Sequence, residues 1–318
     1  MLNLGSIFHC KLSMRALSSL CLVAVSAVIV SCGTPARSID PMAPSPMDPI
    51  VQKPINDQFE FKPKPAFQYP RGVDGVPYTK SPSVIVFDPR SQQVIYERNA
   101  HEKRAVASTQ KLLTALVARA KNPTDRYIEV PYEATLLEPT KLYVKSGARY
   151  PLYYLLKSLV VKSANDVAHT IAHGVSGSKN AFVNDMNQYA RQIGMRNSHF
   201  KNPHGLTESG QYSTAYDVAL LASAAYRDPY IRQCVKTREM DFVHNDGRAV
   251  NFKNTNLLLH RIPYCVGMKT GTTKASGKCL ASIGTLAGQT RIVVVLGAST
   301  RQQLFDESEA LLRWSLEG

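Results

Sequence analysis

The residues best suited to chemistry are a serine and a lysine three positions apart. Ser108 and Lys111 stand at the start of an apolar run, so they should share one face in the first turn of a helix. A serine hydroxyl is a poor nucleophile until a neighbouring base removes its proton. Lys111 can be that base only if its pKa is lowered, by burial or by a second cation such as Lys269. The pair therefore predicts a nucleophile, Ser108, and its base, Lys111.

A second motif supplies groups for the other steps of acyl transfer. Ser163 and Asn165 directly follow the apolar run over residues 151–161, where a loop can place a hydroxyl and an amide in a cleft. We expect Ser163 to relay a proton between Lys111 and the leaving amine. We expect Asn165 to hold the backbone amide of the substrate.

A third motif predicts an anion-binding wall opposite Ser108. Lys269 supplies positive charge for a substrate carboxylate, and Thr270 and Thr272 can donate hydroxyls to it. Gly271 leaves room for a ligand against a strand. We expect the oxyanion hole at the backbone N–H groups of Ser108 and Thr272. Each motif alone is common, but the three in this order predict one catalytic site.

Hydrophobic periodicity places these motifs on secondary-structure elements. Apolar β-branched runs predict strands at 83–87, 93–96, 265–272, 279–285 and 291–297, with a hairpin turn at 245–247. Helical spacing predicts helices from 108 to 121, over 151–161, 165–175, 178–193 and 304–316, and from Thr214 onward. The order of these elements predicts an α/β protein with an antiparallel sheet flanked by helices. An all-α subdomain should be inserted at about residues 125–212.

The composition limits the classes of partner that the protein is expected to bind. The chain has 318 residues, 44% of them hydrophobic, and a net charge of +14, which favours an anionic neighbourhood such as phospholipid or cell-wall polymer. Aromatic residues do not interleave with a basic run, so we expect no nucleic-acid partner. The cysteines Cys234, Cys265 and Cys279 lack the spacing of a zinc site, and both one disulfide with a free thiol and three thiols stay open.

The N-terminal segment predicts export. The apolar run 20–30 ends before Cys32, so we predict a lipoprotein signal peptide at residues 1–31 and lipid on Cys32. An ordinary secretory peptide cleaved near Ser31 is the alternative, and Met14 is a possible true start. Residues 32–80 are rich in proline and predict a semi-rigid tether. Residues 81–318 then form the catalytic domain.

The chain from Ser83 to Gly318 resembles the low-molecular-mass penicillin-binding proteins, the D-alanyl-D-alanine carboxypeptidases of a serine peptidase family. Besides the three motifs, the resemblance covers residues 202–206, 212–217, 254–256 and 267–280. It implies a β-lactamase/transpeptidase-like fold and acylation of Ser108 by the penultimate D-Ala carbonyl of a peptidoglycan stem peptide. Terminal D-Ala would be released, and β-lactams would act as covalent inhibitors. The location implied is the bacterial cell envelope, on the periplasmic or extracytoplasmic side of a membrane.

Two departures from the family pattern stand out. Ala164 replaces a common glycine, which should leave Ser163 and Asn165 in place. Relatives often continue into a β-rich domain and a C-terminal amphipathic helix. We expect lipid on Cys32 and the tether to replace that anchor.

Several other functions compete with the carboxypeptidase. They are a β-lactamase, a D,D-endopeptidase and a penicillin-binding lipoprotein that acylates without turnover. His169 and His173 have zinc-like spacing, but the glutamate of metalloproteases is missing between them. We therefore expect no metal and no cofactor.

Overall fold

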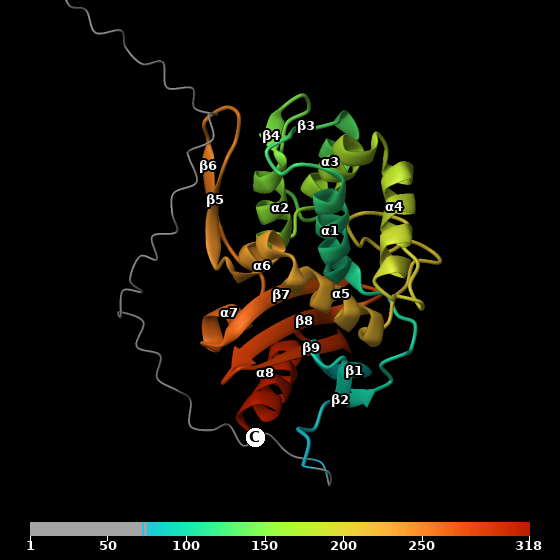
Figure 1. Ribbon diagram of the computed structural model, residues 1–318. Helices are drawn as coiled ribbons and strands as arrows, with labels where there is room; N and C mark the ends of the chain where they lie inside the picture. The colour runs from blue at the N-terminus through green and yellow to red at the C-terminus, as the bar shows by residue number, and fades with distance from the viewer. Residues whose placement is uncertain (1–71, 73–74) are drawn as a thin grey trace, which may run out of the picture. The chain divides into compact units, whose positions relative to one another are not determined.

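A five-stranded antiparallel sheet forms the centre of the fold. The structure, a computed structural model, describes residue 72 and residues 75–318. The strand order is β2-β1-β9-β8-β7, which places β7, the strand of the third motif, at one edge (Figure 1). The strands are β1 (Ser83–Asp88), β2 (Gln93–Arg98), β7 (Cys265–Thr273), β8 (Gly277–Leu286) and β9 (Gln289–Ala298). The two predicted N-terminal strands are confirmed and pair as an antiparallel hairpin, and the three predicted C-terminal strands are confirmed as well.

Helices cover both faces of this sheet (Figure 1). On one face lies α8 (Arg301–Glu317), and on the other lies a block of helices. The block contains α1 (Lys111–Lys121), α2 (Leu152–Val161), α3 (Asn165–Ser176), α4 (Lys179–Gln192), α5 (Ala215–Arg227) and α6 (Pro229–Lys236), and the short α7 (Leu258–Arg261) packs beside β7.

Both faces of the central strands are buried, which explains their nearly continuous apolar sequences. Successive strand residues point to opposite faces. Ile85 and Phe87 accordingly join the core under the helical block, whereas Val84 and Val86 join the core under α8. The predicted α/β architecture is therefore correct.

The segment at 125–212 is less helical than predicted. Helices α2, α3 and α4 fill its middle, but it begins with a small antiparallel pair, β3 (Tyr127–Glu129) and β4 (Arg149–Pro151), and the 3-10 turn η2 (Tyr132–Leu136) lies between these strands. Strands of three residues show too little alternation to be detected in a sequence. The hairpin turn predicted at 245–247 joins β5 (Glu239–Val243) to β6 (Ala249–Lys253).

Side-chain hydroxyls cap the first turns of two helices, α4 and α5. The hydroxyl of Ser178 accepts from the Ala181 N–H at the start of α4. Thr214 Oγ1 accepts from the N–H of Asp217, 3.0 Å away, at the start of α5. The Asp217 carboxylate accepts from Asn197 N and Ser198 Oγ. It thereby ties the loop before α5 to the helix.

The structure describes the three C-terminal cysteines but not the N-terminal segment. Cys234, Cys265 and Cys279 are buried free thiols. The predicted signal peptide, Cys32 and most of the tether lie outside the described residues. Among the residues that are described, no helix has both the length and the hydrophobicity to cross a membrane.

We expect the Thr214→Ala variant to lose about 1 kcal/mol of unfolding free energy, because the first turn of α5 would lose its side-chain cap. Urea unfolding followed by circular dichroism measures this loss. Thr214→Ser keeps the capping hydroxyl and should unfold closer to the wild type. Equal stability of the Ala variant and the wild type would contradict the cap.

Candidate active site

Ser108 lies in a tight turn that leads directly into α1. The turn is the 3-10 helix η1 (Ala107–Gln110), so Ser108 and Lys111 are adjacent as predicted. Ala107 has a φ of 49°, an uncommon conformation for a residue other than glycine. Gly205 packs against it so closely that a Cβ there would lie 2.2 Å from Ala107 O.

A polar loop at residues 202–206 fixes this turn from outside the three motifs. Gln110 Nε2 donates to Asn202 O at 2.6 Å, and Thr114 Oγ1 donates to Pro203 O at 2.6 Å. Both donors are buried, so these contacts replace water for groups that need a partner. The loop therefore fixes the position of the Ser108 turn relative to α1.

The amine of Lys111 contacts three separate segments of the chain. Its Nζ lies 2.8 Å from Ser108 Oγ, 2.8 Å from Asn165 Oδ1 and 2.5 Å from His204 O. Its side chain is fully buried. Ser108 Oγ also donates to His204 O, at 3.3 Å.

Electrostatics favour the uncharged form of this amine. Burial, followed by the nearby charge of Lys269, lowers the pKa of Lys111 well below its usual value, and Asp166 acts in the opposite direction. Burial also lowers the pKa of Lys269, to about 7. These are the two causes that the sequence predicted for Lys111.

The neighbours of Lys111 suit a neutral amine. Asn165 Oδ1 and His204 O can only accept, and a neutral amine has two N–H groups to donate to them. Its lone pair can then accept the Ser108 proton once the hydroxyl turns from His204 O, to which it donates in this structure, toward Nζ. The geometry can therefore move the Ser108 proton onto Lys111.

Ser163 lies in the loop between α2 and α3. It adopts a left-handed conformation with a φ of 69° and is buried. Among the described residues, its hydroxyl makes no hydrogen bond, so its role as a proton relay stays a prediction. Two residues later, Asn165 begins α3 and reaches Lys111 directly.

The third motif lies on β7. Lys269 is buried, and its Nζ donates to Thr270 O at 3.1 Å. The hydroxyl of Thr270 donates to Thr255 Oγ1 at 2.7 Å, whereas Thr272 is exposed. Their contacts with a substrate carboxylate remain predictions.

Gly271 has a packing role that the sequence did not reveal. A Cβ at this position would lie 2.8 Å from Ser108 N, 2.9 Å from Val106 O and 3.0 Å from the Ala107 Cβ. The strand therefore approaches the backbone of the Ser108 turn only because the residue is glycine. This contact joins the first motif to the third.

The histidine pair shows no metal site. No group of three or more His, Cys, Asp or Glu residues suited to a metal occurs in the described part of the chain. Burial lowers the pKa of His169. The ring of His204 is buried as well, and burial lowers its pKa to about 3, which keeps the imidazole neutral beside Lys111.

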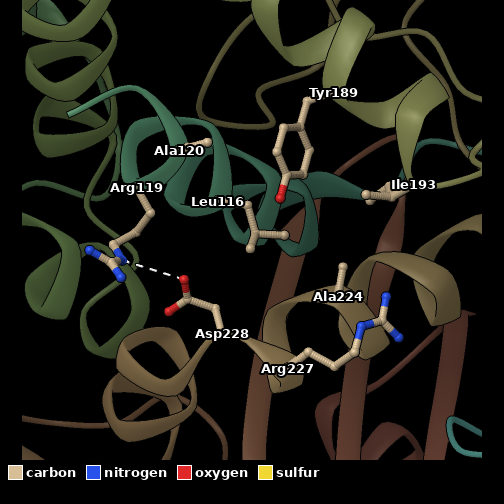
Figure 2. A pocket seen from close by; sticks show the side chains of 8 residues that line it. All are labelled: Leu116, Arg119, Ala120, Tyr189, Ile193, Ala224, Arg227 and Asp228. Carbon is tan, nitrogen blue, oxygen red and sulfur yellow. Dashed lines mark hydrogen bonds and ion pairs between the residues drawn. The ribbon is translucent and has the colours of Figure 1, made fainter.

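A separate cavity of about 410 Å³ lies near the C-terminal ends of α1, α4 and α5 (Figure 2). It is lined by Leu116, Arg119, Ala120, Tyr189, Ile193, Ala224, Arg227 and Asp228. The Arg119 guanidinium contacts the Asp228 carboxylate across it, with 3.4 Å between Nε and Oδ2. None of the predicted catalytic or substrate-binding residues, all of which are described, lines this cavity, so it is distinct from the candidate active site.

Comparison with known proteins decides the family. The family model for D-alanyl-D-alanine carboxypeptidase matches residues 73–300. The chain belongs to the D-alanyl-D-alanine carboxypeptidase family. This confirms the family inferred from the three motifs, and all three lie inside the matched region.

Curated relatives agree with this family. The carboxypeptidase DacC of Escherichia coli is 35% identical over 242 residues, which cover 72% of this chain and 60% of DacC. DacF of Bacillus subtilis is 30% identical over 226 residues, covering 70% of this chain and 58% of DacF. A D-alanyl-D-alanine endopeptidase of Escherichia coli is 31% identical, covering 75% of this chain and 78% of that protein. The chain thus spans about three fifths of these two carboxypeptidases.

Solved structures show the same fold. A D-alanyl-D-alanine carboxypeptidase from Mycobacterium tuberculosis superposes with a TM-score of 0.72 at 28% identity, covering 79% of this chain and 95% of that structure. The carboxypeptidase DacD from Francisella tularensis gives a TM-score of 0.71 at 28% identity, covering 75% of this chain and 70% of that structure. The transpeptidase-like fold predicted from the motifs is thus confirmed.

We expect the Lys269→Met variant to be acylated by a penicillin with an altered pH profile. Loss of the nearby cation raises the pKa of Lys111, so the ionisation that controls acylation should move to higher pH. Stopped-flow acylation rates across pH measure the shift. Lys274→Met removes an exposed lysine beyond the same strand and should leave the ionisation unchanged. An unmoved or lowered ionisation in Lys269→Met would contradict the coupling.

We expect the Gly271→Ala variant to be acylated roughly tenfold to a hundredfold more slowly, because its methyl group would push β7 away from the Ser108 turn. The same acylation assay measures the rate, and thermal unfolding shows whether the protein remains folded. A folded variant that acylates at the wild-type rate would show that the close approach is unimportant.

Proposed function

We propose that the protein is a serine-type D-alanyl-D-alanine carboxypeptidase that removes the terminal D-Ala of peptidoglycan stem peptides through an acyl-enzyme on Ser108. The observation that carries this proposal is the 2.8 Å contact between Ser108 Oγ and the buried amine of Lys111. Few sites on a protein combine a hydroxyl with a lysine whose surroundings disfavour its charge. The family supplies the substrate class.

The acylation step follows from this pair. The Ser108 proton moves to Lys111 Nζ while Oγ bonds to the penultimate D-Ala carbonyl carbon. The oxyanion that forms accepts from backbone N–H groups, for which we propose those of Ser108 and Thr272. The peptide C–N bond then breaks, and the proton on Lys111 passes, through Ser163, to the leaving amine of D-Ala. Water attacks the ester in the second half of the cycle, which frees the shortened peptide and returns the proton to Ser108.

The terminal carboxylate of the substrate should bind beside Lys269. The pKa of Lys269 is about 7 in the unliganded protein, and an adjacent carboxylate favours its charged form. Binding near neutral pH would therefore be accompanied by proton uptake. Thr270, Gly271 and Thr272 complete this carboxylate site, and Asn165 holds the substrate amide on the opposite wall.

β-Lactams would acylate the same serine. Opening of the lactam ring leaves the departing amine attached to the acyl group, so it cannot diffuse away as D-Ala does. The adduct should therefore persist. A β-lactamase would hydrolyse it quickly, and a non-turnover penicillin-binding lipoprotein would form it without releasing D-Ala from peptides.

An endopeptidase acting on cross-links is the second candidate. The relative named as a D-alanyl-D-alanine endopeptidase is matched over 78% of its length, more than DacC or DacF. The nucleophile and its base would be the same in both reactions. The two functions differ in whether the amine that leaves is a free D-Ala or a cross-linked side chain.

The N-terminal segment would place this activity at the cell envelope. We propose a signal peptide over residues 1–31, lipid on Cys32, a tether through residue 80 and a catalytic domain at 81–318. Lipid on Cys32 would attach the protein to a membrane without a spanning helix. Loss of detergent partitioning in the Cys32→Ala variant would support the anchor, and unchanged partitioning would exclude it.

We expect the Ser108→Ala variant to lose covalent labelling by benzylpenicillin and release of D-Ala from a stem pentapeptide, because no oxygen nucleophile remains. Intact mass spectrometry and D-Ala detection measure the two losses. Ser91→Ala changes an exposed serine of the first hairpin and should keep both activities. An adduct on Ser108→Ala would overturn the assignment of the nucleophile. Cleavage of a cross-linked dimer without D-Ala release would favour the endopeptidase.

A further inference from the structure

Asp166, the residue after Asn165, is a fully buried carboxylate outside the predicted site. Its oxygens accept from the backbone N–H of Leu142 at 3.1 and 3.0 Å, of Val144 at 3.3 Å and of Val167 at 2.9 Å. All of these partners are donors, which suits an ionised carboxylate that can only accept. The carboxylate therefore binds residues 142–144 to the first turn of α3.

The loop fixed in this way holds Asn165. The Asn165 N–H donates to Thr140 O at 2.7 Å, and its Nδ2 donates to Glu138 O at 3.2 Å. With Nδ2 engaged by a carbonyl, Oδ1 is the atom left to face Lys111 Nζ, 2.8 Å away. If the amide rotated by half a turn, both of these side-chain contacts would be lost.

Asp166 also acts on Lys111 as a negative charge, although burial raises the pKa of the Asp166 carboxyl itself. It raises the pKa of Lys111, whereas burial and Lys269 on β7 lower it. The neighbouring imidazoles are neutral: burial lowers the pKa of His204 beside Lys111 and of His244, which faces Asp166 from the β5–β6 hairpin. Lys111 is therefore set between one cation and one anion.

We propose that Asp166 is a positioning residue of the reaction, which clamps residues 138–144 onto the start of α3, aims Asn165 Oδ1 at Lys111 and opposes the effect of Lys269 on Lys111. This inference rests on the proposed function, because it requires Lys111 to act as the base. Asp166 itself touches neither substrate nor nucleophile. Its effect is transmitted through Asn165 and through the electrostatic field at Lys111.

The test compares two substitutions that separate charge from shape. Asp166→Asn removes the charge and turns one acceptor into a donor. The rate of penicillin acylation at the plateau of its pH profile should therefore fall roughly tenfold to a hundredfold. Its controlling ionisation should also move to lower pH, because the pKa of Lys111 falls without the anion. Asp166→Glu keeps the charge but lengthens the side chain. It should lower the plateau while the ionisation stays near the wild-type value.

A matched control removes a buried carboxylate elsewhere. Asp217 is as buried as Asp166 and also accepts from a backbone N–H, but it is not among the groups that act on Lys111. Asp217→Asn should lower stability without moving the ionisation. The readout is intact mass spectrometry of the full chain with benzylpenicillin across pH, with rates taken per folded molecule from thermal unfolding.

The outcomes separate this inference from the proposed function. If the wild type forms no adduct on Ser108, the proposed function fails. If the wild type is labelled but Asp166→Asn shows an unmoved or raised ionisation, only the role of Asp166 is overturned. If Asp166→Asn does not fold, Asp166→Glu decides, and a wild-type plateau in that variant contradicts the clamp.

Discussion

The burial of two lysine side chains, close enough that the charge of one lowers the pKa of the other, is the constraint on which this site depends. Both Lys111 and Lys269 have a lowered pKa in the folded protein, whereas in the unfolded chain they would titrate near 10.4. Between about pH 7 and 10.4, Lys269 holds a proton in the unfolded chain that it has lost in the folded protein. The contribution of Lys269 to folding stability therefore rises with pH across this range. The cost of burying its charged form is greatest in acid. The two apolar cores on either side of the sheet must offset this cost.

The fold keeps the buried amine of Lys111 close to the Ser108 hydroxyl by bringing four distant segments together. The Ser108 turn, the start of α3 and the 202–206 loop meet at Lys111, and the edge strand β7 packs against the Ser108 turn. Two contacts allow this approach only because glycines stand at 205 and 271. Since each segment belongs to a different element, the helical block and the sheet must be complete before the site exists.

The sequence was enough to predict the side chains that the structure brings together at Lys111, but not most of the contacts that hold them. Ser108, Lys111 and Asn165 could be predicted because their side-chain chemistry and order are distinctive, and the structure brings all three together. His204 contributes a carbonyl, which every residue has, so its side chain gave no sign of this contact. Asp166 resembles an ordinary helix-start carboxylate until the loop that it binds is seen. β3 and β4 were missed because strands of three residues show almost no period.

The most direct test of the account is the titration of Lys111 itself. Nuclear magnetic resonance of the folded protein with labelled lysine side chains, assigned through the Lys111→Arg variant, follows its ε-carbon and Nζ signals across pH. The account predicts that Lys111 loses its proton well below the range of ordinary lysines and that most of the amine is neutral where the enzyme acylates. A Lys111 signal that titrates near 10.4, like an exposed lysine, would contradict it.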